Sequence, residues 1–311
     1  MEFLKLQKSL KYTSLKNTKQ MKKLIIYSSI LIVLICIPPQ TSSAQNISSL
    51  DSMRENQFEG KSYGLISTDY YNDIIFLGRK SSTKAPYLSV LAGYYHKSGL
   101  FINGGISYLA ASGENRIDLF TAKVGYNFYL KSFSAGISGV KYIFNNKSYT
   151  AKSELSGNIS AYVDYDFDIL DVYIDASTYF GNTSDFIVGA GVSHAFYTFN
   201  DKLKITPSIY LNMGSQNYYS DYNNNQRFGR HMLNGGGSQS IGTGMMGASM
   251  QVLDYEFSVP VRYSLSKFHF SFTPVFAIPV NPVTITNNQI TYKEDLSNSF
   301  FWSAGVSYTF L

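Results

Sequence analysis

Charged residues recur at every second position in several stretches whose alternate positions are apolar. Between Leu253 and Tyr263, for example, Asp254, Glu256 and Arg262 alternate with apolar side chains. A period of two places such charges on one face of a β-strand, opposite the apolar face. Acids and bases on a shared inner face would control which ions or polar solutes can enter. The alternation places the following residues on this face: Lys123, Asp164, Asp175, Lys204, Asp254, Glu256 and Arg262.

Nucleophilic or metal chemistry would need histidine beside serine or acidic residues, and the sequence offers little of this kind. The four histidines are His96, His194, His231 and His269. No G-x-S-x-G motif is present, and no spacing of histidine and acidic residues suggests a metal site. We therefore expect no catalytic residue, no metal and no cofactor, and we interpret the protein as a non-enzyme. A lipid-hydrolysing barrel is the least favoured alternative.

About twelve alternating stretches must position the charged residues, and clusters of Gly, Asn, Asp, Ser and Lys separate them. After the N-terminal region, no stretch has a helical period. Every second connection is short, and the two longest, at about 215–248 and 282–299, fall in the other set. The predicted strands cover 65–78, 86–96, 100–111, 116–130, 132–144, 149–166, 170–181, 185–199, 203–216, 249–265, 268–281 and 300–311.

Connections that alternate between short and long decide the architecture. Transmembrane barrels of bacterial outer membranes have an even number of strands, short periplasmic turns and longer external loops. A soluble β-sandwich also alternates in polarity, but nothing in that fold requires all of its short turns to lie at one end. Tyr and Phe near the strand ends suit the interfacial aromatic belt of a membrane barrel. The sequence therefore predicts an all-β fold, a transmembrane antiparallel up-and-down β-barrel of about twelve strands, over residues 61–311.

The N-terminal region reads as a secretory signal peptide over residues 1–44, with a start at Met21. Lysines precede an uncharged stretch from Leu24 to Ile37, which is shorter than the roughly 20 residues of a membrane helix. Small residues up to Ala44 offer a cleavage site. Residues 45–60 are polar and predict a flexible periplasmic lead-in. Cys36, the only cysteine, lies in the uncharged stretch, so the mature chain carries no thiol chemistry.

The formal net charge of +5 comes from this leader. Seven of the 26 basic residues and one of the 21 acidic residues lie in residues 1–44, which leaves 19 and 20 in the remainder. No basic surface is left that would favour nucleic acid as a partner.

The last residues, "FFWSAGVSYTFL" (300–311), alternate between apolar and small polar side chains up to the chain end. In a barrel the last strand must pair with the first, because an open edge in hydrocarbon leaves polar groups unpaired. This ending resembles the C-terminal strand by which outer-membrane proteins of Gram-negative bacteria are recognised for insertion, although such strands usually stop on Phe and this one adds Leu311. The resemblance implies the outer membrane as location, with its lipid and the barrel-insertion machinery as partners.

A second resemblance is shorter. The stretch "STDYYNDIIFLGR" (67–79) is similar to the opening of TorF-like porins. We expect a passive porin-like channel for small solutes or ions. The alternative is a non-conducting structural barrel, or one that binds a ligand or partner.

The barrel interior admits two interpretations. Eight strands leave room only for side chains and sixteen leave an aqueous channel, so twelve strands fit either a narrow pore or a plugged barrel. Acids and bases in similar numbers predict no preference for cations or anions. The Gly- and Asn-rich stretch 214–248 either folds into the mouth with Arg227, Arg230 and His231 at the entrance, or forms a surface loop.

Overall fold

The computed structural model describes residues 61–80, 84–111, 113–148, 150–218, 250–282, 284–287 and 290–310. The predicted signal peptide and lead-in lie outside these residues, as do Arg227, Arg230 and His231.

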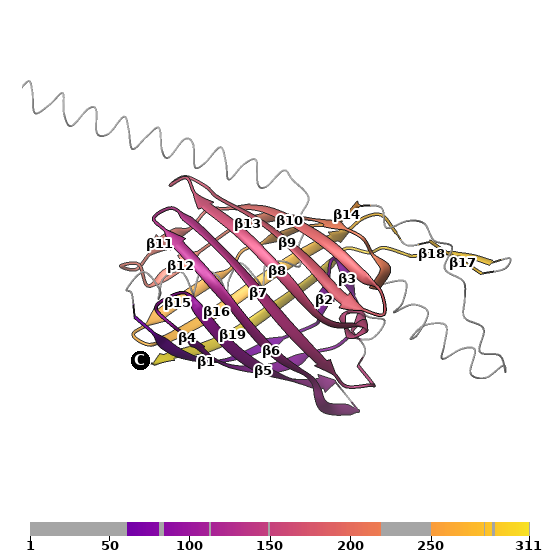
Figure 1. Cartoon of the computed structure of the whole chain (residues 1–311), viewed down its shortest axis with the longest axis horizontal. Helices are drawn as coiled ribbons and strands as arrows, with labels where there is room; N and C mark the ends of the chain where they lie inside the picture. The colour runs from indigo at the N-terminus through magenta and orange to yellow at the C-terminus, as the bar shows by residue number, and fades with distance from the viewer. Residues whose placement is uncertain are drawn as a thin grey trace, which may run out of the picture. The chain divides into compact units, whose positions relative to one another are not determined.

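Twelve antiparallel strands close into an up-and-down barrel (Figure 1), which confirms the predicted fold. Each strand pairs with its neighbours in chain order, and the last strand closes the barrel by pairing with the first. The spanning strands are β1 (Tyr63–Tyr71), β4 (Tyr87–Tyr95), β5 (Leu100–Ala111), β6 (Glu114–Leu130), β7 (Phe133–Phe144), β8 (Leu155–Asp166), β9 (Asp171–Gly181), β10 with β11 (Ser184–Ser193, Phe196–Thr198), β12 with β13 (Leu203–Ile205, Ser208–Gly214), β14 with β15 (Gln251–Ser258, Val261–Leu265), β16 (Phe268–Pro279) and β19 (Ser299–Phe310).

Two spanning strands are interrupted by proline at neighbouring positions of the sheet. Pro207 separates β12 from β13, and Pro260 separates β14 from β15. Proline lacks an amide hydrogen and cannot donate to the ladder. Bonding continues across the breaks, since the Thr206 amide donates to the Pro260 carbonyl at 2.9 Å and the His194 amide donates to the Pro207 carbonyl at 3.2 Å. Each interrupted pair therefore acts as one spanning strand.

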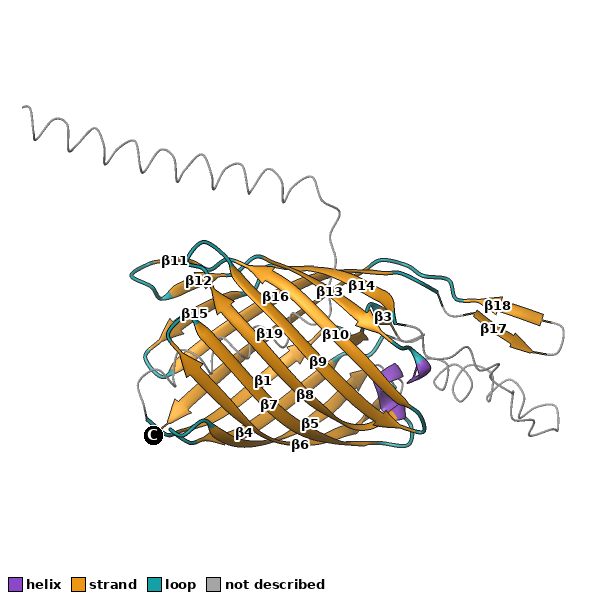
Figure 2. Cartoon of the chain, turned by 45° about the horizontal axis from the view of Figure 1, so that its top comes forward, coloured by secondary structure: helices purple, strands orange, loops and turns teal. Residues whose placement is uncertain are grey.

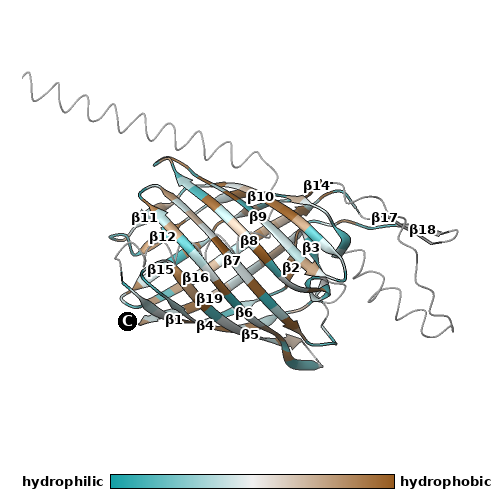
Figure 3. Cartoon of the chain, in the orientation of Figure 1, coloured by the Kyte–Doolittle hydropathy of each residue, from teal (hydrophilic) through white to brown (hydrophobic). Residues whose placement is uncertain are grey.

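The two faces of the strands differ in polarity, and hydrophobic and hydrophilic residues alternate along them in Figure 3. Outward side chains such as Val124, Ile137 and Ile159 are 52–58% exposed. Inward side chains such as Asn127 and Asn158 are buried. An apolar outer face around a polar interior is the pattern of a barrel that lies in lipid. Among the described residues, no helix has the length and apolar character needed to cross a membrane.

The two ends of the barrel differ in their connections. The tight turns and the C-terminus lie at one end, here called the turn end; the longer connections lie at the other, the loop end (Figure 2). At the loop end a 3-10 helix, η1 (Ala151–Glu154), precedes β8. A hairpin of β17 (Thr284–Asn287) and β18 (Ile290–Lys293) lies between β16 and β19, in a region predicted to be a loop.

The first predicted strand, 65–78, is wrong at its C-terminal end. β1 stops at Tyr71, and β2 (Ile75–Phe76) pairs with β3 (Arg79–Lys80) in a separate hairpin. Leu77 and Gly78 form its two-residue turn with φ of 51° and 73°, a left-handed pair that matches the twist of a tight hairpin. Asp73 ties together the two ends of the segment between β1 and β4. Its Oδ1 accepts hydrogen bonds from the backbone amides of Ile74 at 2.9 Å and Ala85 at 3.0 Å.

Close packing at Gly189 gives a stability prediction. A Cβ at this position of β10 would lie 2.5 Å from both Asp175 Oδ1 and Tyr210 Cζ. Overpacking costs about 1–3 kcal/mol, so we expect Gly189→Ala to lower the free energy of unfolding in detergent by about that amount. Gly139→Ala on β7 is the control, because a Cβ there meets nothing within 4 Å. An equal loss from both variants would contradict a role for the Tyr210 contact.

Candidate functional site

The connection between β1 and β4 folds into the barrel at the loop end. We call its described residues, 72–80 and 84–86, the inner loop. Phe76 and Leu77 of this loop pack into an apolar cluster built from the opposite wall. The other members of this cluster are Leu119 (β6), Val140, Tyr142 and Phe144 (β7), Leu155 (β8), Tyr179 (β9), Ile187 (β10), Tyr218 and Leu253 (β14).

The neighbouring residue of the inner loop reaches a different wall. Ile75 packs with Val275 and Ala277 of β16 and with Phe301 of β19. In the strand order of the sheet, β16 and β19 lie half the barrel away from β7 and β8. Adjacent residues of the inner loop thus contact opposite walls, so the loop crosses the interior and narrows it.

Arg79 fastens the inner loop to two other loops. Its Nη1 donates to the Leu77 carbonyl at 3.2 Å, and its Nη2 donates to Gln216 Oε1 at 2.6 Å and to the Asn281 carbonyl at 3.1 Å. Its Nε lies 3.5 Å from Glu294 Oε1, and both side chains are almost fully buried. A planar guanidinium can serve several acceptors at once, which a lysine cannot do in the same geometry.

A buried carboxylate fixes one of the partners of Arg79. Asp185 accepts hydrogen bonds from Ser215 Oγ at 2.5 Å and from the amides of Asn217 and Tyr218, both at 2.8 Å. These bonds order the chain that follows β13. Gln216 is thereby held where Arg79 can reach it.

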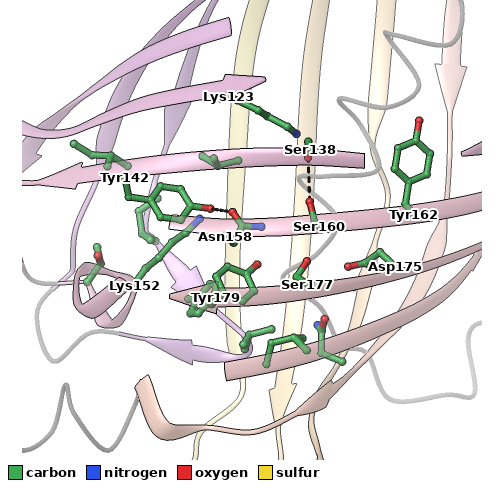
Figure 4. A pocket seen from close by; sticks show the side chains of 18 of the residues that line it. Lys123, Ser138, Tyr142, Lys152, Asn158, Ser160, Tyr162, Asp175, Ser177 and Tyr179 are labelled. Carbon is green, nitrogen blue, oxygen red and sulfur yellow. Dashed lines mark hydrogen bonds between the residues drawn. The ribbon is translucent and has the colours of Figure 1, made fainter. Parts of the chain in front are cut away.

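A cavity of about 300 Å³ lies inside the barrel beside the inner loop. Its polar wall contains Ser138, Ser160 and Ser177, which occupy directly paired positions on β7, β8 and β9 (Figure 4). The Ser138 and Ser160 hydroxyl oxygens are 3.0 Å apart, and Tyr142 OH donates to Asn158 Oδ1 at 2.8 Å. Three adjacent strands thus present a row of hydroxyl groups to the cavity.

Two lysines line the same cavity without an acidic partner. Lys123 comes from β6 and Lys152 from η1. The Lys152 Nζ lies 4.5 Å from the ring centre of Tyr142 and 5.4 Å from that of Phe76, and the Lys123 Nζ lies 5.6 Å from that of Phe101. Within the described ranges no carboxylate lies within 4.0 Å of either ammonium group. Burial lowers the pKa of the Lys152 side chain, since desolvation disfavours the charged form.

A third polar group of the cavity also lacks a partner. Thr150, one residue before η1, is 3% exposed and lines the cavity. Its Oγ1 makes no hydrogen bond to any group that the structure describes. Buried polar groups are almost always hydrogen-bonded, so Thr150 is one of the exceptions in the described part of the chain.

The far wall of the cavity carries the only acidic side chain in its described lining. Asp175 of β9 accepts a hydrogen bond from Tyr210. The Tyr173 ring stacks on the Tyr162 ring at 5.8 Å and lies 6.0 Å from that of Tyr210. Along the strands, Asp175 with the Tyr162 and Tyr173 rings therefore lies on one side of the serine row, and Lys123 lies on the other.

At the turn end, two cations are directly paired across neighbouring strands. Lys204 pairs in register with Arg262, and both are 9% exposed. Arg262 Nη2 lies 3.0 Å from His269 Nδ1, and Ser264 Oγ lies 3.0 Å from the same nitrogen. A serine–histidine pair needs an acid to stabilise the imidazolium. The third group here is a guanidinium, which opposes that charge.

The other predicted lumen charges also lie on the inner face. Asp164 accepts a hydrogen bond from Ser134 Oγ at 2.9 Å, and Asp254 accepts one from Asn212 Nδ2 at 2.7 Å. Glu256 is fully buried. Of the seven predicted residues, only two, one lysine and one aspartate, line the cavity; a functional role for the seven stays a prediction.

The sequence pattern does not identify three residues of the interior. It predicts a connection at Arg79, and it predicts a strand over Thr150 and Lys152 that begins instead at Leu155. For Arg79, the sequence contains one indication of the hairpin. The apolar run at 74–77 is followed by Gly78, and this combination can form a hairpin turn as well as continue a strand. The described residues contain no group of three His, Cys, Asp or Glu that could hold a metal ion.

Several solved structures resemble this chain at low sequence identity. No family model matches the chain, and no curated protein sequence matches it. Among solved structures, the KdgM porin is 11% identical with a TM-score of 0.44 over 80% of this chain and 99% of the porin. The NanC porin is 10% identical with a TM-score of 0.43 over 79% and 98%. An outer membrane channel from Pseudomonas putida F1 is 10% identical with a TM-score of 0.41 over 80% and 95%.

Proposed function

We propose that this protein is a passive, porin-like channel in the outer membrane of a Gram-negative bacterium, with a restricted passage for small polar solutes or ions. The observation that carries the proposal is the polar cavity inside a closed barrel whose outer face is apolar. A row of hydroxyls, with two lysines that have no carboxylate partner among the described residues, suits transient contact with a polar solute.

The outer surface supports a membrane location. Large apolar side chains are exposed on strands all around the barrel, including Leu88 on β4, Phe186 on β10 and Phe270 on β16. Soluble monomers rarely expose apolar patches beyond a few hundred Å², so such a surface suits lipid contact. Outer-membrane lipid and the barrel-insertion machinery are the partners that this location implies.

One observation favours a second candidate, a non-conducting barrel that binds a partner or stabilises the envelope. The inner loop places Phe76 and Leu77 across the interior, and Arg79 fastens it there. In this alternative the loop closes the barrel permanently, whereas in the channel it forms a narrow constriction beside the cavity.

Single-channel recording of the refolded mature protein in a planar bilayer tests the proposal. We expect discrete conductance steps. Arg262→Gln should shift the reversal potential in a salt gradient toward cation preference, because it removes one of two paired cations at the turn end. Lys202→Gln, in an exposed turn, is the control and should leave the reversal potential unchanged. A folded, inserted protein that stays electrically silent would contradict the channel and favour the second candidate.

A further inference from the structure

We propose that the cavity between Lys123 and Lys152 binds a small solute that carries an anionic carboxylate or phosphate group together with several hydroxyl groups. The inference rests on the proposed channel function in one respect: it makes this cavity the selective site of the passage.

The lysines supply the anionic part of the recognition. At the loop end, the described guanidinium groups of Arg79 and Arg116 are both paired with carboxylates. The Lys123 ammonium group lies over the Phe101 ring and that of Lys152 over the Tyr142 ring, and neither has a carboxylate within 4.0 Å among the described residues. A partly desolvated ammonium group with no counter-charge gains strongly from an anion, because the interaction is stronger away from bulk water.

The serines supply the hydroxyl part of the recognition. Ser138, Ser160 and Ser177 lie side by side on three strands, and hydroxyl groups can both donate and accept hydrogen bonds. The hydroxyl groups of a solute could pair with this row, whereas a simple halide could accept from it but offers no donor.

The arrangement of charge also orients the solute. Both lysines lie at one side, with the serine row beside them, and Asp175 with the tyrosine rings lies at the other. An anionic group near the lysines would keep its distance from the carboxylate, while hydroxyl groups could reach Asp175 and the ring faces. The volume of about 300 Å³ is at the lower end of ligand pockets, which favours a single small molecule over a polymer.

A binding experiment tests the site independently of conduction. D-Glucuronate is titrated calorimetrically into the refolded mature protein in detergent, with D-glucose as the neutral probe of similar shape. We expect glucuronate to bind and glucose to bind at least roughly tenfold more weakly, because hydrogen bonds to charged groups are the stronger ones. The double variant Lys123→Gln/Lys152→Gln should weaken glucuronate binding roughly tenfold to a hundredfold.

Lys141→Gln is the matched control. Lys141 lies on β7 between the cavity-lining residues Val140 and Tyr142, but its own side chain is exposed on the outer face. It removes the same charge without touching the cavity, so its affinity for glucuronate should equal that of the wild type. Heat-dependent gel migration verifies that each variant is folded.

The outcomes separate the site from the channel. Glucuronate binding that is lost only in the double variant supports the site, even if the bilayer stays silent and the channel proposal fails. Equal binding of glucose and glucuronate, no binding of either, or undiminished binding in the folded double variant would overturn the site. A conducting protein with any of these results would keep its channel function and lose only this inference.

Discussion

Arg79→Ala should conduct in larger steps than the wild-type protein, or conduct where the wild type is silent. The guanidinium holds the inner loop to Gln216, Asn281 and Glu294 at the loop end. Its removal leaves Glu294 buried without this partner, and breaking one side of a buried ion pair costs about 3–5 kcal/mol. The loop can escape this cost by leaving the interior, because local openings need only part of the global stability.

The expected change is confined to the loop, and two measurements can show this. Limited proteolysis should cut the Arg79→Ala protein within residues 72–86 faster than the wild type, while denaturant unfolding of the barrel changes little. Lys80→Ala is the matched control, since Lys80 is the neighbouring cation of the same hairpin but is exposed. If Arg79→Ala frees the loop to protease and the conductance stays that of the wild type, then the inner loop is not the constriction.

Alternation was sufficient to predict the strands because the barrel wall imposes one rule on every residue. A side chain faces either lipid or the interior, so polarity with a period of two is set locally. In β19, for example, Trp302, Val306 and Tyr308 lie on one face and the serines lie on the other. Pairing the last strand with the first also followed from the sequence, since an open edge in hydrocarbon is costly.

The inner loop could not be predicted in the same way. Residues 74–77 form a short apolar run soon after β1, which a local pattern does not distinguish from the end of a strand. Their contacts are with residues far away in the sequence, such as Tyr142 and Val275. Local patterns carry no information about which distant wall an apolar segment will meet, because tertiary packing decides this.

The residues of the cavity likewise differ in how far the sequence predicts them. Parity placed Lys123 on the inner face, because that depends only on the strand around it. Whether its ammonium group has a carboxylate partner depends on strands and loops that the barrel brings together. Lys152 and Thr150 belong to a connection, where no periodic pattern constrains side-chain direction.

Deleting residues 300–311 should abolish folding of the barrel. β19 pairs with eight residues of β1 and with ten residues of β16. Without it both neighbours become open edges, and each unpaired backbone group in hydrocarbon costs several kcal/mol. The sum far exceeds the stability of about 5–15 kcal/mol that is typical of folded proteins. We expect no heat-modifiable folded band after refolding, and no protein in the membrane fraction.

A shorter deletion distinguishes the effect of the β19 strand pairing from any effect of the terminal residue itself. Removing Leu311 alone leaves β19 intact up to Phe310, which pairs with Gly64 of β1. This variant should fold and insert like the wild type if the strand pairing is what the ending provides. Efficient folding of the long deletion would show that β1 and β16 can close the barrel directly, with eleven strands. That result is disfavoured, because eleven antiparallel strands would require the closing pair to run in the same direction.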